Sequence, residues 1–185
     1  MRVLGISGSL RRDSHNTELL RAAATLLPSG VEFVLHDGLR EIPPYDADVE
    51  HEPAPAVKAL RDAIADADAV LIATPEYNHS MPGVLKNALD WVSRPLETNS
   101  LRNKPVAVIG ASTGMFGAVW AQAETRKVLA AIGARVVDRE LPVPTADEIV
   151  RDRAKLESSG THSLLVGILA ELIAEARERE LRVAA

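Results

Sequence analysis

Two short apolar runs constrain the fold of this chain more than any other feature. They are AVLIA at Ala69–Ala73 and PVAVI at Pro105–Ile109, and no polar residue interrupts either of them. Each run is followed by a segment with helical periodicity. A strand that is apolar at every position is typical of a parallel sheet with helices on both faces, because both sides of such a strand are buried. The two runs therefore predict an α/β protein.

Strands and helices alternate along the rest of the chain in the same way. Further strands are predicted at Arg2–Ile6, Val31–Leu35 and Gly133–Val137. Helices are predicted at about Asn16–Leu27, around Val57, Leu60 and Ile64, at Met81–Val92, at Gly117–Ile132 and through Leu164–Ala176. Five strands in 185 residues favour a flavodoxin-like doubly wound parallel sheet of order 2-1-3-4-5, with helices on both faces. We predict a single domain over residues 1–185, in which the charged stretch Glu148–Glu157 is a solvated surface segment.

Composition excludes several classes of protein and site. The net charge of −5 argues against a protein that coats nucleic acid by neutralising phosphates. The chain has no cysteine, which excludes disulfides, thiolate zinc sites, iron–sulfur clusters and thiol nucleophiles, and we predict no metal site. The first strand begins at once, and Glu171 and Glu175 interrupt the apolar stretch Leu164–Ala176. We therefore expect no leader, no membrane span and a cytoplasmic location.

The predicted topology indicates where a ligand would bind. In doubly wound sheets ligands lie outside the carboxyl ends of the strands, near the point where the strand order reverses. The loops after the first, third and fourth predicted strands are Ser7–Asn16, Thr74–Pro82 and Gly110–Gly117. All three are rich in residues that bind through backbone or small polar groups. We expect the three loops to form one site.

The first of these loops has the chemistry of a phosphate site. SGSLRRDSHNT places hydroxyls and an amide where a strand turns into a helix, and Arg11 or Arg12 can add a bidentate cation. The start of a helix also offers free N–H donors and partial positive charge. The alternative is that Ser14 or Asn16 merely caps the helix. Neither a Walker loop nor the G-x-G-x-x-G fingerprint is present.

The second loop suits a flat heteroaromatic ligand. In TPEYNHSMPGVLKNALDW, Pro75 and Pro82 stiffen a loop whose backbone can read a polar rim, and Tyr77 or Met81 can cover a ring face. His79 is expected to be exposed to solvent, not catalytic. Glu76 could be a general base, but no partner for it lies nearby in sequence. The residues that follow on the helix, Lys86, Asn87, Asp90 and Trp91, are expected to anchor the loop or a subunit interface.

The third loop, ASTGMFGA at Ala111–Ala118, contains two glycines that allow close approach of a ligand to the backbone. By itself it is equally consistent with an ordinary turn from strand to helix. Beside the other two loops it becomes the third wall of a site. Phe116 or Trp120 could instead face a substrate or a neighbouring subunit.

GISGSLRRDSHNTELL followed by PEYNHSMPGVLKNALDW resembles the NAD(P)H-dependent FMN reductase family, which includes bacterial quinone, chromate and azo-dye reductases. The resemblance extends from residue 2 to about residue 140 and implies a flavodoxin-like fold with non-covalent FMN. It implies that the FMN phosphate is held by Ser9, Arg11, Ser14, Asn16 and Thr17. It also implies that the isoalloxazine ring is bordered by Pro75, Glu76, Tyr77 and Asn78. Ser112, Thr113 and Gly114 are the candidates beside the ring and the ribityl chain.

The expected activity is transfer of a hydride from NAD(P)H through bound FMN to a quinone-like or other small acceptor, in a ping-pong cycle. The flavin carries this chemistry, so no catalytic side chain is assigned. One alternative is an FMN-binding electron carrier without reductase activity, and another is a phosphate- or nucleotide-binding regulatory module without flavin. The resemblance also implies a homodimer or homotetramer. Four large residues on or beside the loops, Tyr77, Trp91, Phe116 and Trp120, suit such contacts, although core packing explains some of them equally well.

Overall fold

A parallel sheet of six strands runs through the middle of the protein in the computed structural model, which describes residues 1–184. Its strands are β1 Arg2–Ser7, β2 Glu32–His36, β3 Ala69–Thr74, β4 Pro105–Ala111, β5 Arg135–Val136 and β6 Pro142–Val143. The α-helices are α1 His15–Thr25, α2 Pro55–Asp66, α3 Gly83–Val92, α4 Val119–Ile132, α5 Ala146–Ile149, α6 Arg153–Ser158 and α7 Gly160–Ala184. Two 3₁₀ turns, η1 Gly38–Glu41 and η2 Ala47–Val49, lie between β2 and α2.

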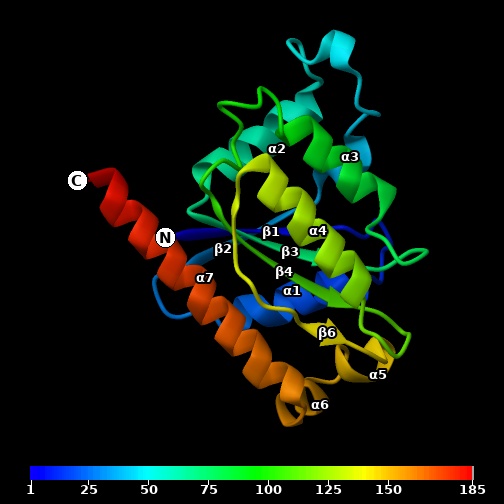
Figure 1. Ribbon diagram of the computed structural model, residues 1–185. Helices are drawn as coiled ribbons and strands as arrows, with labels where there is room; N and C mark the ends of the chain where they lie inside the picture. Colours follow the sequence, from blue (N-terminus) through cyan, green and yellow to red (C-terminus); the bar gives the residue numbers. More distant parts are fainter. Residues whose placement is uncertain (185) are drawn as a thin grey trace.

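The order β2-β1-β3-β4-β5 confirms the predicted doubly wound topology. Helices α2, α3 and α4 cover one face of the sheet, and α1 and α7 cover the other (Figure 1). Every residue of β3 and β4 is buried, as their uninterrupted apolar runs predicted. The strand order reverses between β1 and β3, so the loops that leave these two strands open on opposite sides of the switch point.

Strand β6 was not predicted. β5 pairs with the beginning of β4, and β6 pairs with its end at Gly110 and Ala111, so both strands occupy the same side of β4. A strand of two residues has no periodicity that a sequence pattern could reveal. Its effect is local, because it supports the loop that follows β4.

The stretch Glu148–Glu157 is not simply a solvated segment, which corrects the prediction. It contains the end of α5 and most of α6. Its two apolar anchors, Val150 and Leu156, are 7% and 4% exposed. Val150 joins the core cluster formed with α1 and α7, because the short helices turn their few apolar residues inward.

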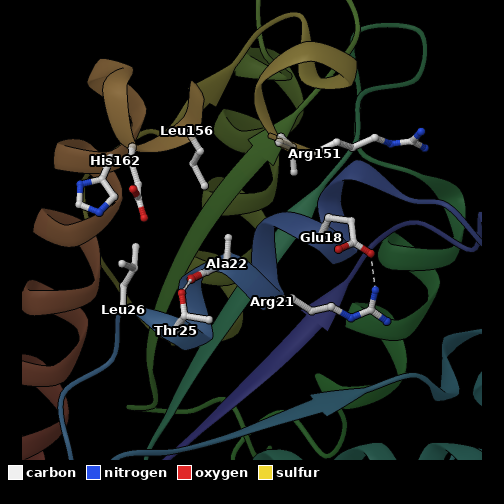
Figure 2. Close-up of a pocket in the computed structure, with 10 residues that line it drawn as sticks. Glu18, Arg21, Ala22, Thr25, Leu26, Arg151, Leu156 and His162 are labelled. Atoms are coloured by element: carbon white, nitrogen blue, oxygen red, sulfur yellow. Dashed lines mark hydrogen bonds and ion pairs between the residues drawn. The ribbon is translucent and has the colours of Figure 1, made fainter. Parts of the chain in front are cut away.

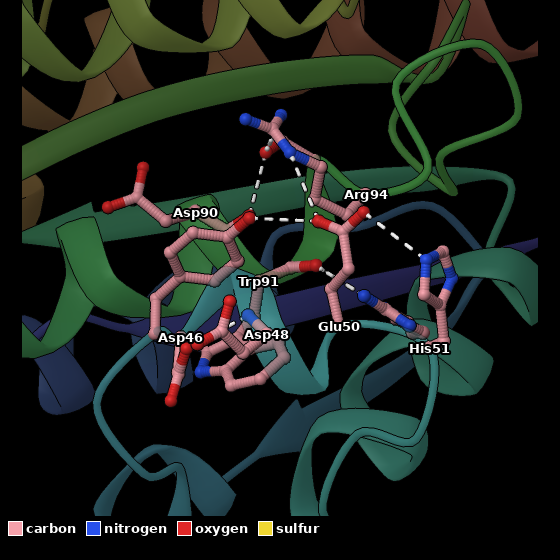
Figure 3. A network of polar contacts seen from close by, with 10 residues as sticks. Asp46, Asp48, Glu50, His51, Asp90, Trp91 and Arg94 are labelled. Atoms are coloured by element: carbon pink, nitrogen blue, oxygen red, sulfur yellow. Dashed lines mark hydrogen bonds and ion pairs between the residues drawn. The ribbon is translucent and has the colours of Figure 1, made fainter.

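The connection between β2 and α2 is fastened to α3. The side chains of Asn87 and Trp91 both donate hydrogen bonds to the Pro43 carbonyl, and Asn87 Oδ1 accepts one from the Tyr45 N–H. The Tyr45 hydroxyl donates to Glu50, whose carboxylate also lies 3.6 Å from Arg94 (Figure 3). Asn87 and Trp91 therefore anchor this connection, and not the loop after β3 that they were expected to anchor. Trp91 is only 1% exposed, so it belongs to the core and not to a surface.

Within the described residues, no helix is both long and apolar enough to cross a membrane.

Lys104 is a buried cation directly before the first residue of β4, at the opposite end of this strand from the third loop. It is 2% exposed, and its Nζ donates hydrogen bonds to the carbonyls of Ala65 and Ala67 at the end of α2. Burial lowers the pKa of Lys104 to about 8. The bonds satisfy carbonyls that the helix leaves without partners, which favours a cationic donor at this position.

The stability of the protein is expected to increase between about pH 8 and pH 10, because of Lys104. In this range the unfolded chain still binds a proton that folded Lys104 has lost, so its contribution to the free energy of unfolding rises by up to about 1.4 kcal/mol per pH unit. Urea unfolding at a series of pH values measures this rise. The Lys104→Met variant should not show this rise in the free energy of unfolding. An equal rise in both proteins would mean that groups other than Lys104 cause it.

Candidate functional site

The loops after β1, β3 and β4 converge on one cavity at the carboxyl ends of these strands. Its lining residues are Ser9, Arg11, Ser14, His15, Asn16, Pro75, Glu76, Tyr77, Ala111, Ser112 and Thr113. The first loop and the start of α1 form one wall of the cavity, and the loops after β3 and β4 form the others. The sheet topology thus brings together three segments that are far apart in the sequence.

Hydroxyl groups order the first wall. The Ser14 hydroxyl caps α1 by accepting a hydrogen bond from the Thr17 N–H at 3.3 Å. The Thr17 hydroxyl donates to Ser7 Oγ at 2.9 Å, and Ser9 Oγ accepts from the Arg11 N–H at 3.4 Å. Capping by Ser14, the alternative role considered from the sequence, is therefore real. Because Ser14 Oγ acts as an acceptor in this cap, the hydrogen of the Ser14 hydroxyl remains free to be donated to a ligand.

Asn16 ties the first wall to the third. Its amide side chain donates to the Ala111 carbonyl and accepts from the Ala111 N–H, both at 2.9 Å. Asn16 is 3% exposed, and this pairing crosses 95 residues of sequence. One amide N–H of Asn16 remains for a ligand. The residue therefore holds the cavity together as well as lining it.

The second wall is a tight hairpin. Tyr77 and Ser80 exchange two backbone hydrogen bonds, of 3.0 and 3.1 Å. The two residues between them, Asn78 and His79, have φ angles of 54° and 60°. Positive φ at both central positions is what a type I′ turn requires, and asparagine and histidine tolerate it better than most residues. The sequence Asn-His is thus explained by turn geometry.

Two carboxylates fasten this hairpin to α4. Glu76 Oε2 accepts from the backbone N–H groups of Trp120 and Ala121 in the first turn of α4, at 3.0 and 3.2 Å. Glu124 accepts from the Ser80 hydroxyl and the Met81 N–H, and these two bonds lower the pKa of Glu124. Glu76 therefore caps a helix that has no side-chain cap of its own, instead of standing free as a general base.

The third wall is supported by the strand that the sequence did not reveal. The Ser112 N–H donates to the Val143 carbonyl of β6 at 3.0 Å, and Ser112 Oγ accepts from the Gly114 N–H at 3.1 Å. A Cβ at Gly117 would lie 2.5 Å from the backbone of Pro142 and Val143, so only glycine fits there. The loop is therefore held against β6 close to the cavity.

His15 was not singled out from the sequence, yet it lines the cavity. It is 7% exposed, and its Nδ1 is buried without a hydrogen-bond partner among the described residues. Burial lowers the pKa of His15, and the nearby cations Arg151 and Arg11 lower it further. A single histidine in a polar loop carries no signal of burial in sequence, because only the packing of α1 encloses its ring.

The structure places the twelve predicted site residues as follows. Nine of them line the cavity, namely Ser9, Arg11, Ser14, Asn16, Pro75, Glu76, Tyr77, Ser112 and Thr113. Thr17 lines an adjoining cavity together with Ser7, Arg12 and Arg40. Asn78 and Gly114 are not among the described residues that line either cavity. The His79 side chain is 75% exposed, as expected, and lies 3.7 Å from Glu76.

Comparison with known proteins assigns this arrangement to a family. Residues 1–148 match the sequence model of the NADPH-dependent FMN reductases. The chain belongs to this family. It is therefore an NAD(P)H-dependent oxidoreductase with FMN as its cofactor, as the two loop motifs implied.

Individual relatives agree with this assignment. The FMN reductase described here is 50% identical over 130 residues to an NAD(P)H-dependent FMN reductase of Pseudomonas aeruginosa, covering 70% of this chain and 69% of the relative. It is 37% identical to a 2-hydroxy-1,4-benzoquinone reductase of Burkholderia, over 97% and 98% of the two chains. The solved structure of FerB, a flavoenzyme NAD(P)H:(acceptor) oxidoreductase from Paracoccus denitrificans, matches with a TM-score of 0.79 and 34% identity, over 96% and 97% of the chains.

Two alternatives lose their support. The FMN reductase also resembles a flavodoxin from Pseudomonas aeruginosa, but at 19% identity and a TM-score of 0.59, which shows the fold alone. The electron-carrier alternative therefore gains nothing from that likeness. The flavin-free regulatory module is incompatible with the family.

Proposed function

We propose that the cavity between the three loops binds FMN, with the phosphate against the first wall and the isoalloxazine ring between the second and third. The observation that carries this placement is the convergence of the three loops on one cavity at the switch point of the sheet. The donor set of the first wall fits a phosphate, because it combines hydroxyls, a guanidinium and the start of α1.

Individual residues have separate roles in this proposal. Ser9, Arg11, Ser14, Asn16 and Thr17 hold the phosphate. Pro75, Glu76, Tyr77 and Asn78 border the ring, and Ser112, Thr113 and Gly114 approach the ring and the ribityl chain. Because Glu76 and Glu124 fasten the hairpin to α4, its main-chain groups are positioned before a ligand arrives. Such preorganised donors favour the negative charge of a reduced flavin without reorganising during the reaction.

When bound, FMN accepts a hydride from NAD(P)H and passes the electrons on. The protein contributes position, a rigid ring site and exclusion of water on the buried side. We assign no catalytic side chain: Glu76 serves as a helix cap, and His79 forms part of a turn.

We infer that the acceptor is a quinone or another small oxidant that stacks on the exposed face of the ring. Two features support a small acceptor. The relatives include a 2-hydroxy-1,4-benzoquinone reductase and a quinone reductase of Escherichia coli, which is 40% identical over 141 residues. The outer rim of the site is also open, because Tyr77 is 53% exposed.

An absorbance spectrum followed by anaerobic titration with NADPH and with NADH tests the function. The reconstituted protein should show a flavin spectrum that bleaches on titration and returns when benzoquinone is added. A protein that stays colourless after incubation with FMN would contradict the placement. Flavin that bleaches but does not turn over with benzoquinone or related acceptors would contradict the inferred acceptor class.

We also propose that the enzyme self-associates, as a homodimer or homotetramer, through an aromatic patch formed by His79, Phe116 and Trp120. The ring of Trp120 meets those of His79 and Phe116 edge-on, with centroids 4.7 and 4.9 Å apart. Phe116 is 61% exposed, Trp120 is 40% exposed and the adjacent Met115 is 82% exposed. Exposed aromatic and methionine side chains that cluster beside a site are typical of protein interfaces.

The double substitution Phe116→Glu and Trp120→Glu is expected to convert the oligomer to a monomer, because it would bury two charges in the proposed interface. Sedimentation velocity of both proteins at micromolar concentration measures this. Leu164→Glu, on the exposed face of α7 and 47% exposed, is the control and should leave the assembly unchanged. A wild-type protein that sediments as a monomer would contradict the proposal.

We further infer that the enzyme works in the cytoplasm, where its reductant NAD(P)H is available. Its cysteine-free sequence is compatible with that compartment. Separation of cell fractions followed by detection of the protein tests this inference.

A further inference from the structure

A second cavity adjoins the one between the three loops, and most of its residues have no role in the proposed function. It lies between the first loop and the segment that follows β2, and we call it the basic cavity. Its lining includes Leu10, Arg11, Arg12, Asp37, Leu39 and Arg40. The lining thus contains three arginines and one carboxylate, and among the described residues no carboxylate lies within ion-pair distance of these arginines. Guanidinium groups in such excess suit a phosphate.

Arg40 has a guanidinium whose position is fixed by a contact with the first loop. The residue belongs to η1, shortly after β2, and its Nη2 donates a hydrogen bond of 2.7 Å to the Leu10 carbonyl. Because Leu10 also lines the basic cavity, this bond holds the guanidinium beside it. The bond uses one N–H group, and the others have no acceptor among the described residues. Arg40 is exposed, so these donors are available to a ligand.

The cavity between α1 and residues 150–162 does not share this excess of positive charge. Its lining contains two arginines, Arg21 and Arg151, and two carboxylates, Glu18 and Glu157. Figure 2 shows the Arg21 side chain turned toward Glu18, with which it forms an ion pair. The charges in that cavity therefore balance, whereas those of the basic cavity do not.

The strand order places the basic cavity in line with the proposed cofactor site. Along the carboxyl edge of the sheet the strands follow one another as β2, β1, β3 and β4. The basic cavity lies at the ends of β2 and β1, and the proposed phosphate position lies after β1. The proposed ring position lies at the loops after β3 and β4. A ligand that extends from the ring past the phosphate therefore reaches the basic cavity.

The reductant is a ligand of this kind. Its nicotinamide must stack on the flavin ring for hydride transfer, and two riboses and a pyrophosphate separate the nicotinamide from the adenine. This linkage is longer than the ribityl chain of FMN, so the adenosine end extends beyond the FMN phosphate. At that end NADPH carries a 2′-phosphate where NADH has a 2′-hydroxyl. In dinucleotide-binding folds a carboxylate binds the 2′-hydroxyl, whereas an arginine accommodates the 2′-phosphate.

We propose that the basic cavity binds the 2′-phosphate of NADPH, and that Arg40 is the residue that selects NADPH over NADH. Arg12 adds positive charge to the same cavity, and Asp37 opposes the selection because it repels the phosphate. The inference rests on the proposed position of FMN, since the stacked nicotinamide directs the adenosine end toward β2. It deepens the proposed function by assigning the choice of reductant to residues outside the three loops.

Steady-state kinetics of the FMN-loaded enzyme with benzoquinone test this selection. Arg40→Leu should raise the KM for NADPH about tenfold, the effect of one guanidinium–phosphate contact, and should keep kcat and the KM for NADH within about twofold. Asp37→Asn should have the opposite effect and lower the KM for NADPH about twofold, because it removes an exposed like charge.

Arg102→Leu is the matched control. Like Arg40, Arg102 is exposed and its Nη2 donates a hydrogen bond to a backbone carbonyl, that of Leu96. Arg102 precedes β4, however, and so lies at the opposite edge of the sheet from the basic cavity. This substitution should change the KM for neither reductant.

Binding gives a readout that does not depend on turnover. Calorimetry with the oxidised, FMN-loaded protein compares 2′,5′-ADP with 5′-AMP, which differ only in the 2′-phosphate. The wild-type protein should bind 2′,5′-ADP more tightly than 5′-AMP, and Arg40→Leu should weaken the binding of 2′,5′-ADP about tenfold without a comparable effect on 5′-AMP. The affinity for FMN should be the same in both proteins.

Each other outcome contradicts a different part of the proposal. An equal rise in the KM for NADPH and for NADH would overturn the inference, because it would indicate the pyrophosphate that both reductants share. Weaker binding of FMN by Arg40→Leu would also overturn it, because the cavity would then hold the FMN phosphate. Normal FMN binding with unchanged KM values in Arg40→Leu would overturn this inference alone. A wild-type protein that binds no FMN would overturn the proposed placement of the cofactor as well.

Discussion

The Asn16→Leu variant is expected to lose about 3 kcal/mol of its free energy of unfolding, because two buried backbone groups lose their partner together. In the wild-type protein the Asn16 amide satisfies both the N–H and the carbonyl of Ala111, at 2.9 Å each. Leucine has nearly the shape of asparagine but offers neither a donor nor an acceptor. Ala111 is 2% exposed, so water cannot replace the lost bonds.

Urea unfolding of the apoprotein measures this loss. Thr17→Val is the matched control, because it removes one half-buried hydroxyl bond to Ser7 and should cost less than about 1 kcal/mol. Asn16→Leu should also bind FMN more weakly, since the first and third walls are no longer tied together. A variant as stable as the wild type would mean that the bonds to Ala111 are not formed in solution.

The Arg11→Ala variant is expected to bind FMN between about tenfold and a hundredfold more weakly, as one guanidinium–phosphate contact would predict. Arg11 lines the cavity between the three loops, where we propose that FMN binds, whereas Arg12 lines only the adjoining cavity. Arg12→Ala should therefore change the affinity for FMN less than threefold, although it removes one positive charge, just as Arg11→Ala does.

Quenching of FMN fluorescence on titration with apoprotein gives both dissociation constants. Riboflavin is the ligand control, because Arg11→Ala should not alter its affinity. Stability should be unaffected, since the Arg11 side chain is exposed to solvent. Equal effects of the two substitutions would indicate that general positive potential, and not a specific contact, retains the cofactor.

The location of the site could be predicted because it follows from strand order. The continuous apolar runs in β3 and β4 required a parallel sheet, and a doubly wound sheet has one switch point. The loops that meet there are rich in hydroxyls, amides and glycine, which is visible in the sequence without coordinates. Nine of the twelve residues that the family resemblance implied do line one cavity.

The double roles of site residues could not be predicted. Glu76 caps α4, and Asn16 holds Ala111, because partners that are 44 and 95 residues away in sequence become neighbours in the fold. Strand β6 was missed for a related reason, since two residues form a strand only where β4 offers an unpaired edge. Contacts of this kind depend on tertiary packing, which a local pattern does not contain.

The sequence by itself therefore determined the fold, the family and the edge of the sheet where we propose that the cofactor binds. The periodicity of apolar residues and the chemistry of loops are local properties, so they can be read directly. Only the tertiary structure decided which polar groups are already satisfied and which are not. Ser14, Asn16 and Glu76 already have partners inside the protein, whereas the buried Nδ1 of His15 has no partner among the described residues. Burial and pairing of this kind arise only when distant segments pack together.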